Sequence, residues 1–107
     1  GPAVAVDRAG TEHVAWWTGA AGRAGYWYAT GRNGSFAAPV LIRRHPSAPS
    51  ENNATIAIDD HGTAWIATVD HGQYDASGNG EDTSPNRVLV YAIGPGLAPG
   101  RAAESAR

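Results

Sequence analysis

One stretch of this chain spaces oxygen-bearing side chains in the way that a cation-binding loop does. Asp75, Ser77 and Asn79 alternate along it, and a glycine and then Asp82 follow. A hard cation such as calcium takes several oxygen ligands at about 2.4 Å, and the glycine permits the tight turn that gathers them. The twelfth position of an EF-hand loop needs a bidentate Glu, but Asn86 stands there. These four oxygen-bearing residues are therefore candidate calcium ligands, and an acidic loop without an ion is the alternative.

A second polar stretch, residues 43–53, combines guanidinium, imidazole and amide groups. Arg43 and Arg44 offer planar forks suited to a carboxylate or sulfate. His45 has an unperturbed pKa of ~6.5 and could exchange protons, although no pair of carboxylates stands beside it in the sequence. Asn52 adds an amide. We expect an anion or sugar-acid contact here, and a solvated loop stiffened by two prolines is the alternative.

The elements that must position these groups are written twice in the chain. Residues 4–15 recur as residues 56–67, 52 positions later. A period of this size is typical of repeat architectures, in which one unit cannot bury its apolar surface alone. Residues 3–6 and 55–58 alternate β-branched residues with Ala, which predicts strands covered on both faces. Residues 7–10 and 59–62 each begin with Asp and end with Gly, which predicts hairpin turns.

The remaining strands follow from the same comparison. Return strands are predicted over residues 11–17 and 63–69, and third strands over 25–30 and 89–92, with Tyr28 aligned on Tyr91. That alignment puts 11 extra residues into the second copy. Residues 35–42 predict a fourth strand at a sheet edge, where Pro39 is tolerated. The second copy shows no fourth strand, because its Gly, Pro and Ala content predicts a loose tail.

The chain resembles a known family along these segments. The string "AVAVDRAGTEHVAWW…YWYATGRNGSFAAPVLI" is similar to the BNR or Asp-box repeats of bacterial β-propellers in the sialidase-like superfamily. The segment at 30–36 lacks the Asp of a proper Asp-box. The resemblance implies an all-β fold of two antiparallel propeller blades, nominally four-stranded, the second lacking its fourth strand. It also implies a secreted or extracellular location.

The predicted organisation is therefore a first blade with its inter-blade loop, a second blade with an insertion at about 70–86, and a flexible tail, over residues 1–53, 54–93 and 94–107. Propellers close with about four to eight blades. Two blades alone would leave open edges and apolar faces, so we expect completion by oligomerisation or by the remainder of a longer chain. The start at Gly1-Pro2, without Met, resembles a protease scar and favours a fragment.

The topology of a propeller blade predicts at which end of the strands a ligand would bind. In a propeller, the loops between second and third strands and between blades emerge at the same end, here 18–24, 43–53 and 70–86. Trp17 and Tyr74 sit beside these loops and have no aromatic counterpart in the other copy, so we expect both to be partly exposed and to stack on sugars. We expect the other strand aromatics to be buried between blades, namely Trp16, Trp65, Tyr28 and Tyr91.

Composition excludes several classes of partner. The formal net charge of −2 leaves no basic footprint for nucleic acid or an anionic membrane. There is no cysteine, so disulfides and thiolate metal sites are excluded. No apolar run approaches the ~20 residues of a membrane span. No cofactor is expected, apart from the calcium candidate.

The function that these patterns favour is recognition of a carbohydrate or another extracellular ligand by a β-propeller module. The candidate contacts are Trp17, Arg43, Arg44, His45, Asn52 and Tyr74. One alternative is a fragment of a sialidase-like glycoside-processing enzyme, although no catalytic motif makes this chain alone an enzyme. The other alternative is a structural or protein-interaction propeller.

Overall fold

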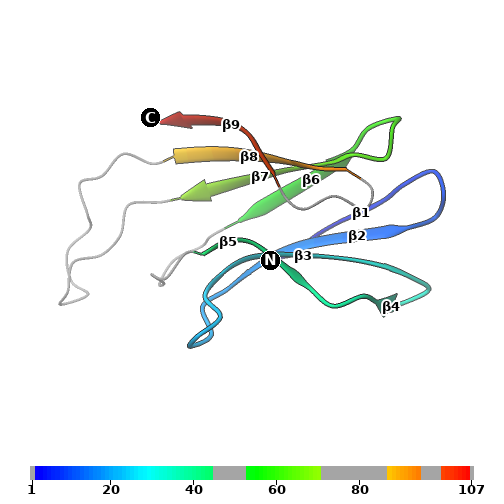
Figure 1. Cartoon of the computed structure of the whole chain (residues 1–107), viewed down its shortest axis with the longest axis horizontal. Helices are drawn as coiled ribbons and strands as arrows, with labels where there is room; N and C mark the ends of the chain where they lie inside the picture. The colour runs from blue at the N-terminus through cyan, green and yellow to red at the C-terminus, as the bar shows by residue number, and fades with distance from the viewer. Residues whose placement is uncertain (1, 45–52, 71–86, 95–99, 107) are drawn as a thin grey trace.

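The computed structural model describes residues 2–44, 53–70, 87–94 and 100–106, and every regular element among them is a β-strand. All strand pairs are antiparallel, and they form two sheets that lie as two layers (Figure 1). The all-β, antiparallel prediction is confirmed. The same described residues contain no helix with the length and hydropathy needed to cross a membrane.

The first sheet is a meander whose fourth position is filled by two short strands. Its order is β1-β2-β3, with β4 and β5 both paired to the far edge of β3. We predicted one continuous strand over 35–42, and that prediction is wrong. The break falls at 37–39, where Pro39 has no N–H to give to a ladder. The strands are β1 (Ala3–Val6), β2 (Glu12–Thr18), β3 (Gly25–Arg32), β4 (Ser35–Phe36) and β5 (Val40–Arg44).

The second sheet is a meander of four strands, in the order β6-β7-β8-β9, whereas the first sheet has five. Its strands are β6 (Ala54–Ile58), β7 (Ala64–Asp70), β8 (Arg87–Ile93) and β9 (Gly100–Ala106). The prediction that the second unit lacks a fourth strand, and that 94–107 is a loose tail, is therefore wrong over 100–106. The edge of β8 offers a row of main-chain groups, and β9 pairs with it despite a sequence of low β-propensity.

Both hairpin turns form as predicted. The amide of Gly10 donates to the carbonyl of Asp7 at 3.0 Å, and the amide of Gly62 donates to the carbonyl of Asp59 at 3.1 Å. Gly10 and Gly62 have φ angles of 86° and 80°, a region that favours glycine. Each Asp also accepts, through its side chain, the amide of the Thr that follows the glycine. The turn chemistry of the two repeats is thus the same.

The register corrects the alignment of the third strands by one residue. Ala15 pairs with Tyr28, whereas its repeat partner Ala67 pairs with Val90. Tyr28 therefore corresponds to Val90, and Tyr91 corresponds to Ala29. The shared Tyr-Ala dipeptide misled the sequence alignment. Because side chains alternate between the faces of a strand, the one-residue correction moves Tyr91 to the opposite face of its unit.

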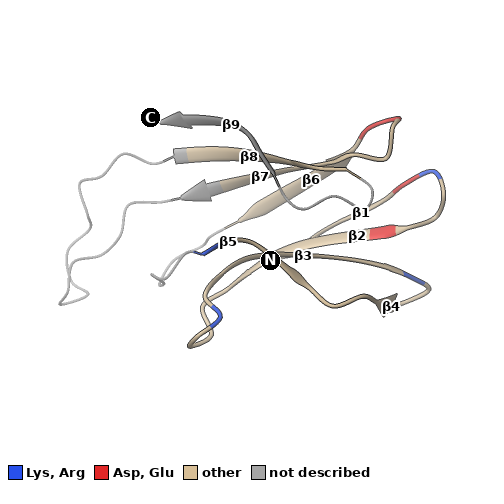
Figure 2. Cartoon of the chain, viewed as in Figure 1, with Lys and Arg blue, Asp and Glu red and all other residues tan. Residues whose placement is uncertain are grey.

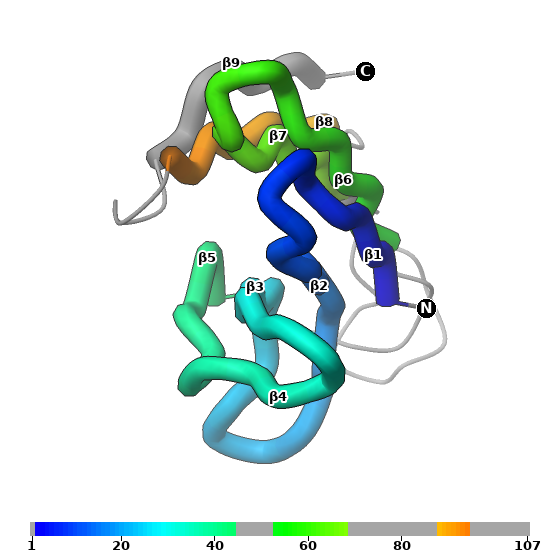
Figure 3. The backbone as a smooth tube through the Cα atoms, turned by 90° about the vertical axis from the view of Figure 1, so that its right-hand side faces the viewer, coloured from blue at the N-terminus to red at the C-terminus, as the bar shows by residue number. Residues whose placement is uncertain are grey.

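The core lies between the two sheets. It combines small and aromatic residues of the first sheet with aliphatic residues of the second, namely Ala15, Tyr26, Tyr28, Ala54, Ala64, Ile66 and Ile93. The first strands of the two sheets, β1 and β6, lie next to each other, whereas β4 is at the edge farthest from the second sheet (Figure 3). We predicted that both first strands are covered on both faces. That prediction is wrong, because Val4 and Val6 on the outer face of β1 are each 61% exposed, and Thr55 and Ala57 on the outer face of β6 are exposed as well.

Candidate functional site

The structure describes only part of the predicted ligand end. Trp17, Arg43 and Arg44 are described. The other candidates lie outside the described residues, namely His45, Asn52, Tyr74 and the four proposed calcium ligands Asp75, Ser77, Asn79 and Asp82. Their roles stay predictions.

Two of the described candidates are brought together. Trp17 on β2 and Arg43 on β5 both pair with Tyr26 on β3, so the three side chains form one row across the inner face of the first sheet. The guanidinium carbon of Arg43 lies 5.7 Å from the centre of the Tyr26 ring, within cation–π range. Arg44, the last residue of β5, is exposed. The end of this sheet therefore carries an aromatic and cationic row.

Trp17 is half-buried, in keeping with the predicted partial exposure, but its ring packs against the core cluster. Its indole N–H is buried and has no hydrogen-bond partner in the described part of the chain. A ring held in this way does not present its face to a sugar. The observation weakens the case for Trp17 as a stacking platform and favours a packing role.

A buried hydrogen-bond chain that sequence reasoning missed runs from the first turn into the core. His13 Nε2 lies 2.9 Å from Asp7 Oδ2, and His13 Nδ1 lies 2.6 Å from the Tyr28 hydroxyl. A carboxylate only accepts, so Nε2 carries the proton, and in the neutral ring Nδ1 accepts from the tyrosine. The hydrogen bond from His13 and that from the Thr11 amide lower the pKa of Asp7. Burial raises the pKa of Tyr28 to about 12.

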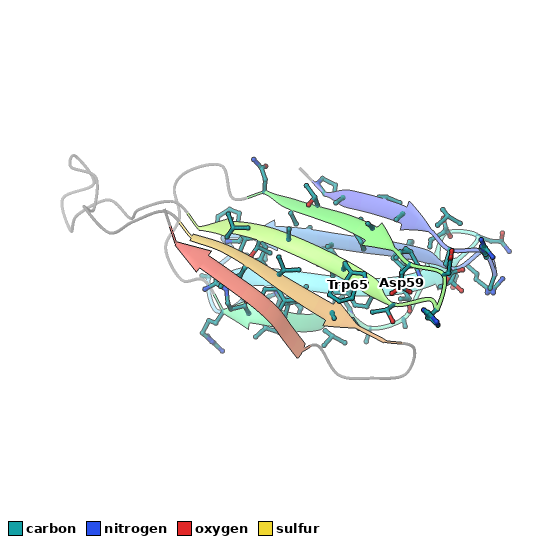
Figure 4. The ribbon with its side chains drawn as sticks, turned by 90° about the horizontal axis from the view of Figure 1, so that it is seen from above. Asp59 and Trp65 are labelled. Carbon is teal, nitrogen blue, oxygen red and sulfur yellow. The ribbon has the colours of Figure 1, made fainter. Side chains whose placement is uncertain are left out.

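An aligned hydroxyl, imidazole and carboxylate could in principle perform nucleophilic chemistry. Here His13 is 5% and Tyr28 8% exposed, so the chain of groups is closed to a substrate. The equivalent residues of the second repeat indicate that these groups have a structural role. Asp59, whose Oδ2 accepts the indole N–H of Trp65 at 3.0 Å, lies beside Trp65 (Figure 4). Trp65 stands where the first repeat has His13. This hydrogen bond, with that of the Thr63 amide, lowers the pKa of Asp59.

The common feature is an Asp that accepts from its own turn and from a side-chain donor six residues later. That spacing, Asp7 to His13 and Asp59 to Trp65, was readable in the sequence once the repeat was aligned. Each Asp thus joins its turn to the following strand through hydrogen bonds. The chemistry of these groups is therefore structural.

A polar hollow of about 390 Å³ lies between the two turns. Arg8 of one turn pairs with Asp60 of the other at 3.3 Å, and both side chains are more than four-fifths exposed. The carboxylates of Asp7 and Asp59 are already used by their own turns. Within the described residues, no three His, Cys, Asp or Glu side chains gather in a way that could hold a metal ion.

A large apolar feature lies on the outer face of the first sheet. A hollow of about 450 Å³ is lined there by Val14, Trp16, Ala29, Phe36, Ala37, Ala38 and Pro39. Described charged residues cluster toward the strand ends and turns, and the sheet centres carry none (Figure 2). The outer face of the first sheet therefore carries a contiguous apolar surface around this hollow.

The aromatic predictions divide accordingly. Tyr28 and Tyr91 are buried, as predicted. Trp65 is 41% exposed on the outer face of the second sheet, so the prediction that it lies between the sheets is wrong. Trp16 is half-buried and lines the outer hollow, so the same prediction is wrong for Trp16. Both tryptophans lie on outer faces, opposite the core between the two sheets.

Comparisons of the chain with models of protein families, with curated proteins and with solved structures found no match.

Proposed function

We propose that this chain is a propeller-type interaction module that binds protein through the outer faces of its two sheets. The observation that carries the proposal is the apolar outer face of the first sheet, where Val4 and Val6 are each 61% exposed beside a hollow of about 450 Å³. Contiguous exposed apolar surface of this kind typically marks an interaction site. Trp16 and Phe36 supply the large aromatic contacts that dominate binding energy at such sites.

The blade part of this proposal rests on topology and on the sequence resemblance. Both repeats are antiparallel meanders, and their first strands, β1 and β6, lie side by side. A propeller arranges its blades with the first strands toward a common axis and buries each sheet between two neighbours. Sheets that are each covered on one side only are therefore consistent with blades that lack neighbours.

Photo-crosslinking in the organism that produces the protein tests this function and does not require the partner to be identified first. A photo-reactive phenylalanine at Val6, on the outer face, should form protein adducts upon irradiation. The same residue at Ala21, in the exposed loop between β2 and β3, is the matched control and should form few. Equal or absent adduct formation at Val6 would refute an interaction function of this face.

A second candidate, recognition of an acidic carbohydrate at the end of the first sheet, is favoured by the row of Trp17, Tyr26 and Arg43. A guanidinium beside aromatic rings suits a sugar that carries a carboxylate. Tyr26 is fully buried and Trp17 packs against the core, so Arg43 and the exposed Arg44 would make the polar contacts. The interaction function is preferred because this row is largely occupied by packing.

A glycan array with sialylated and uronic-acid ligands tests the second candidate. Binding should be lost in Arg44→Gln, an exposed position whose replacement leaves the core intact. Arg32→Gln, at the opposite end of β3, is the control and should bind as the parent does. No binding of any acidic glycan by the parent protein would remove this candidate.

A further inference from the structure

We infer that the partner of the outer faces is a second copy of this chain. The outer face of the first sheet of one copy binds the outer face of the second sheet of the next, in a head-to-tail arrangement. This inference rests on the proposed interaction function and names the partner of the same surfaces. It is derived from the way in which the two repeats pack against each other within one chain.

The two repeats use opposite faces to pack together. In β2, Ala15 is fully buried against the second sheet, while Val14 points to the outer face. In β7, the equivalent of Val14 is Ile66, which is fully buried, and the equivalent of Ala15 is Ala67, which is not. Equivalent residues therefore lie on the buried side in one repeat and on the outer side in the other.

The third strands follow the same rule. Ala15 pairs with buried Tyr28, whereas Ala67 pairs with half-buried Val90. On the other face, Val14 pairs with Ala29, which is buried but lines the outer hollow, whereas Ile66 pairs with Tyr91, which is buried on the inner face. The interface inside the chain thus joins one face of repeat one to the opposite face of repeat two. Such an interface is heterologous.

Each outer face is consequently the repeat equivalent of a face that is already buried. The outer face of the first sheet corresponds to the inner face of the second, with Val4 and Val6 in the places of Ile56 and Ile58, which pack against the core. The outer face of the second sheet corresponds to the inner face of the first, with Ala57 and Trp65 in the places of Ala5 and His13. The two outer faces are therefore equivalent to the two faces that already pack together inside the chain, and we expect them to pack in the same way.

The charged residues of the two turns would also pair favourably in the interface between copies. Arg8 and Asp60 occupy equivalent positions, and they pair across the interface inside the chain. In the next interface, Asp60 of one copy faces Arg8 of the following copy, so opposite charges meet again. Like charges at these positions would oppose the association. The exposed pair contributes little affinity, but it fixes the relative direction of the copies.

A heterologous interface either closes into a ring or grows into a filament. Each copy supplies two sheets, so a closed ring contains an even number of them. Propellers close with about four to eight blades, which corresponds to two to four copies. In a closed ring every outer face would be covered, and in a filament only the outer faces of the two end copies would remain exposed.

A complementation experiment tests the pairing of unlike faces. Val4→Glu with Val6→Glu places charges on the outer face of the first sheet, and Thr55→Glu with Ala57→Glu places them on that of the second. All four positions are exposed in the single chain, so both variants should melt as the parent does at low concentration. Each variant alone should associate at least about tenfold more weakly than the parent, because a charge is costly to bury. The two variants mixed should form a one-to-one dimer, joined through their intact faces.

The outcomes separate this inference from the proposed function. Association of either variant at parental strength would overturn it, because it would indicate that like faces pair. Failure of the mixture to form a dimer would also overturn it. A parent protein that stays monomeric at about 100 µM, a concentration of the order used for weak complexes, would overturn it as well. In that last case, adducts from Val6 to a different protein would still support the interaction function.

Discussion

Trp65 donates its indole N–H to the carboxylate of Asp59 at 3.0 Å, six residues back along the chain and on the outer face of the second sheet. The equivalent positions in the first repeat hold Asp7 and His13, whose Oδ2 and Nε2 atoms lie 2.9 Å apart, and His13 is buried between the sheets. The same local device therefore lies on an inner face in one repeat and on an outer face in the other. It follows that the two repeats pack head to tail, and that the pair Asp59 and Trp65 lies on an outer face.

The Asp59 to Trp65 hydrogen bond can be tested by titration. Trp65→Phe keeps an aromatic ring and removes the donor, so the pKa of Asp59 should rise toward its ordinary value. Carboxyl chemical shifts followed by NMR measure it. Trp27→Phe is the matched control, because the Trp27 indole donates instead to the carbonyl of Arg23 at 2.9 Å. An unchanged Asp59 titration in Trp65→Phe would contradict this assignment.

Acid should destabilise the fold through both turn carboxylates. The pKa values of Asp7 and Asp59 are lowered in the folded state, so the unfolded chain binds protons first as the pH falls. Stability is then present above the ordinary pKa of 3.8 and is lost as the pH drops through the folded values. Thermal melts between pH 7 and 2 should show this loss, with a shallower slope in Asp59→Asn. A parental slope in that variant would refute the contribution of Asp59.

Alkaline conditions should act through Tyr28. Its pKa is raised from 10.0 to about 12, so the unfolded chain releases the phenolic proton first as the pH rises. Stability should therefore decline between pH 10 and 12, at up to ~1.4 kcal/mol per pH unit for one group. Tyr28→Phe should lack this decline.

The Tyr28→Phe variant also has a cost at neutral pH. Removal of the hydroxyl leaves His13 Nδ1 without its donor in a buried site, which costs about 1 to 3 kcal/mol. Urea unfolding at pH 7 measures this loss. Full retention of both stability and alkaline sensitivity would show that the hydrogen bond to His13 contributes nothing.

Repeat-equivalent faces should respond differently to truncation. Ile66→Ala removes a fully buried side chain and should cost about 2 to 5 kcal/mol of unfolding free energy. Val4→Ala, on the outer face, should cost no more than about 0.5 kcal/mol in a dilute sample. At concentrations where copies associate, the cost of Val4→Ala should increase. A similar loss for both variants in dilute solution would contradict the assignment of inner and outer faces.

The sequence predicted the repeat and the turns well because both depend on local chemistry. An Asp that bonds its own turn and a Gly with positive φ determine residues 7–10 and 59–62 without reference to the rest of the fold. The first strands were placed nearly as observed for the same reason. Strand β9 was missed because main-chain pairing to an open edge does not require strand-forming side chains.

The candidate site was harder to predict, because burial depends on which face of a strand meets the neighbouring sheet. The sequence pattern of β1 and β6 is alike, yet Val4 is exposed and Ile56 packs against the core. Trp65 was assigned to the core because its strand was expected to be covered on both faces. A correct third-strand register places Tyr28 and Tyr91 on opposite faces of their units, and this opposition is the sequence signal of head-to-tail packing.

The measurement that tests the account most directly is sedimentation of the parent protein over a range of concentrations. The account predicts a species of at least two copies of the 11.1 kDa chain at high concentration, dissociating upon dilution and weakened by charges on either outer face. A monomer that melts cooperatively and keeps the same mass at every concentration would contradict it. Such a result would mean that the apolar outer faces do not bind a second copy.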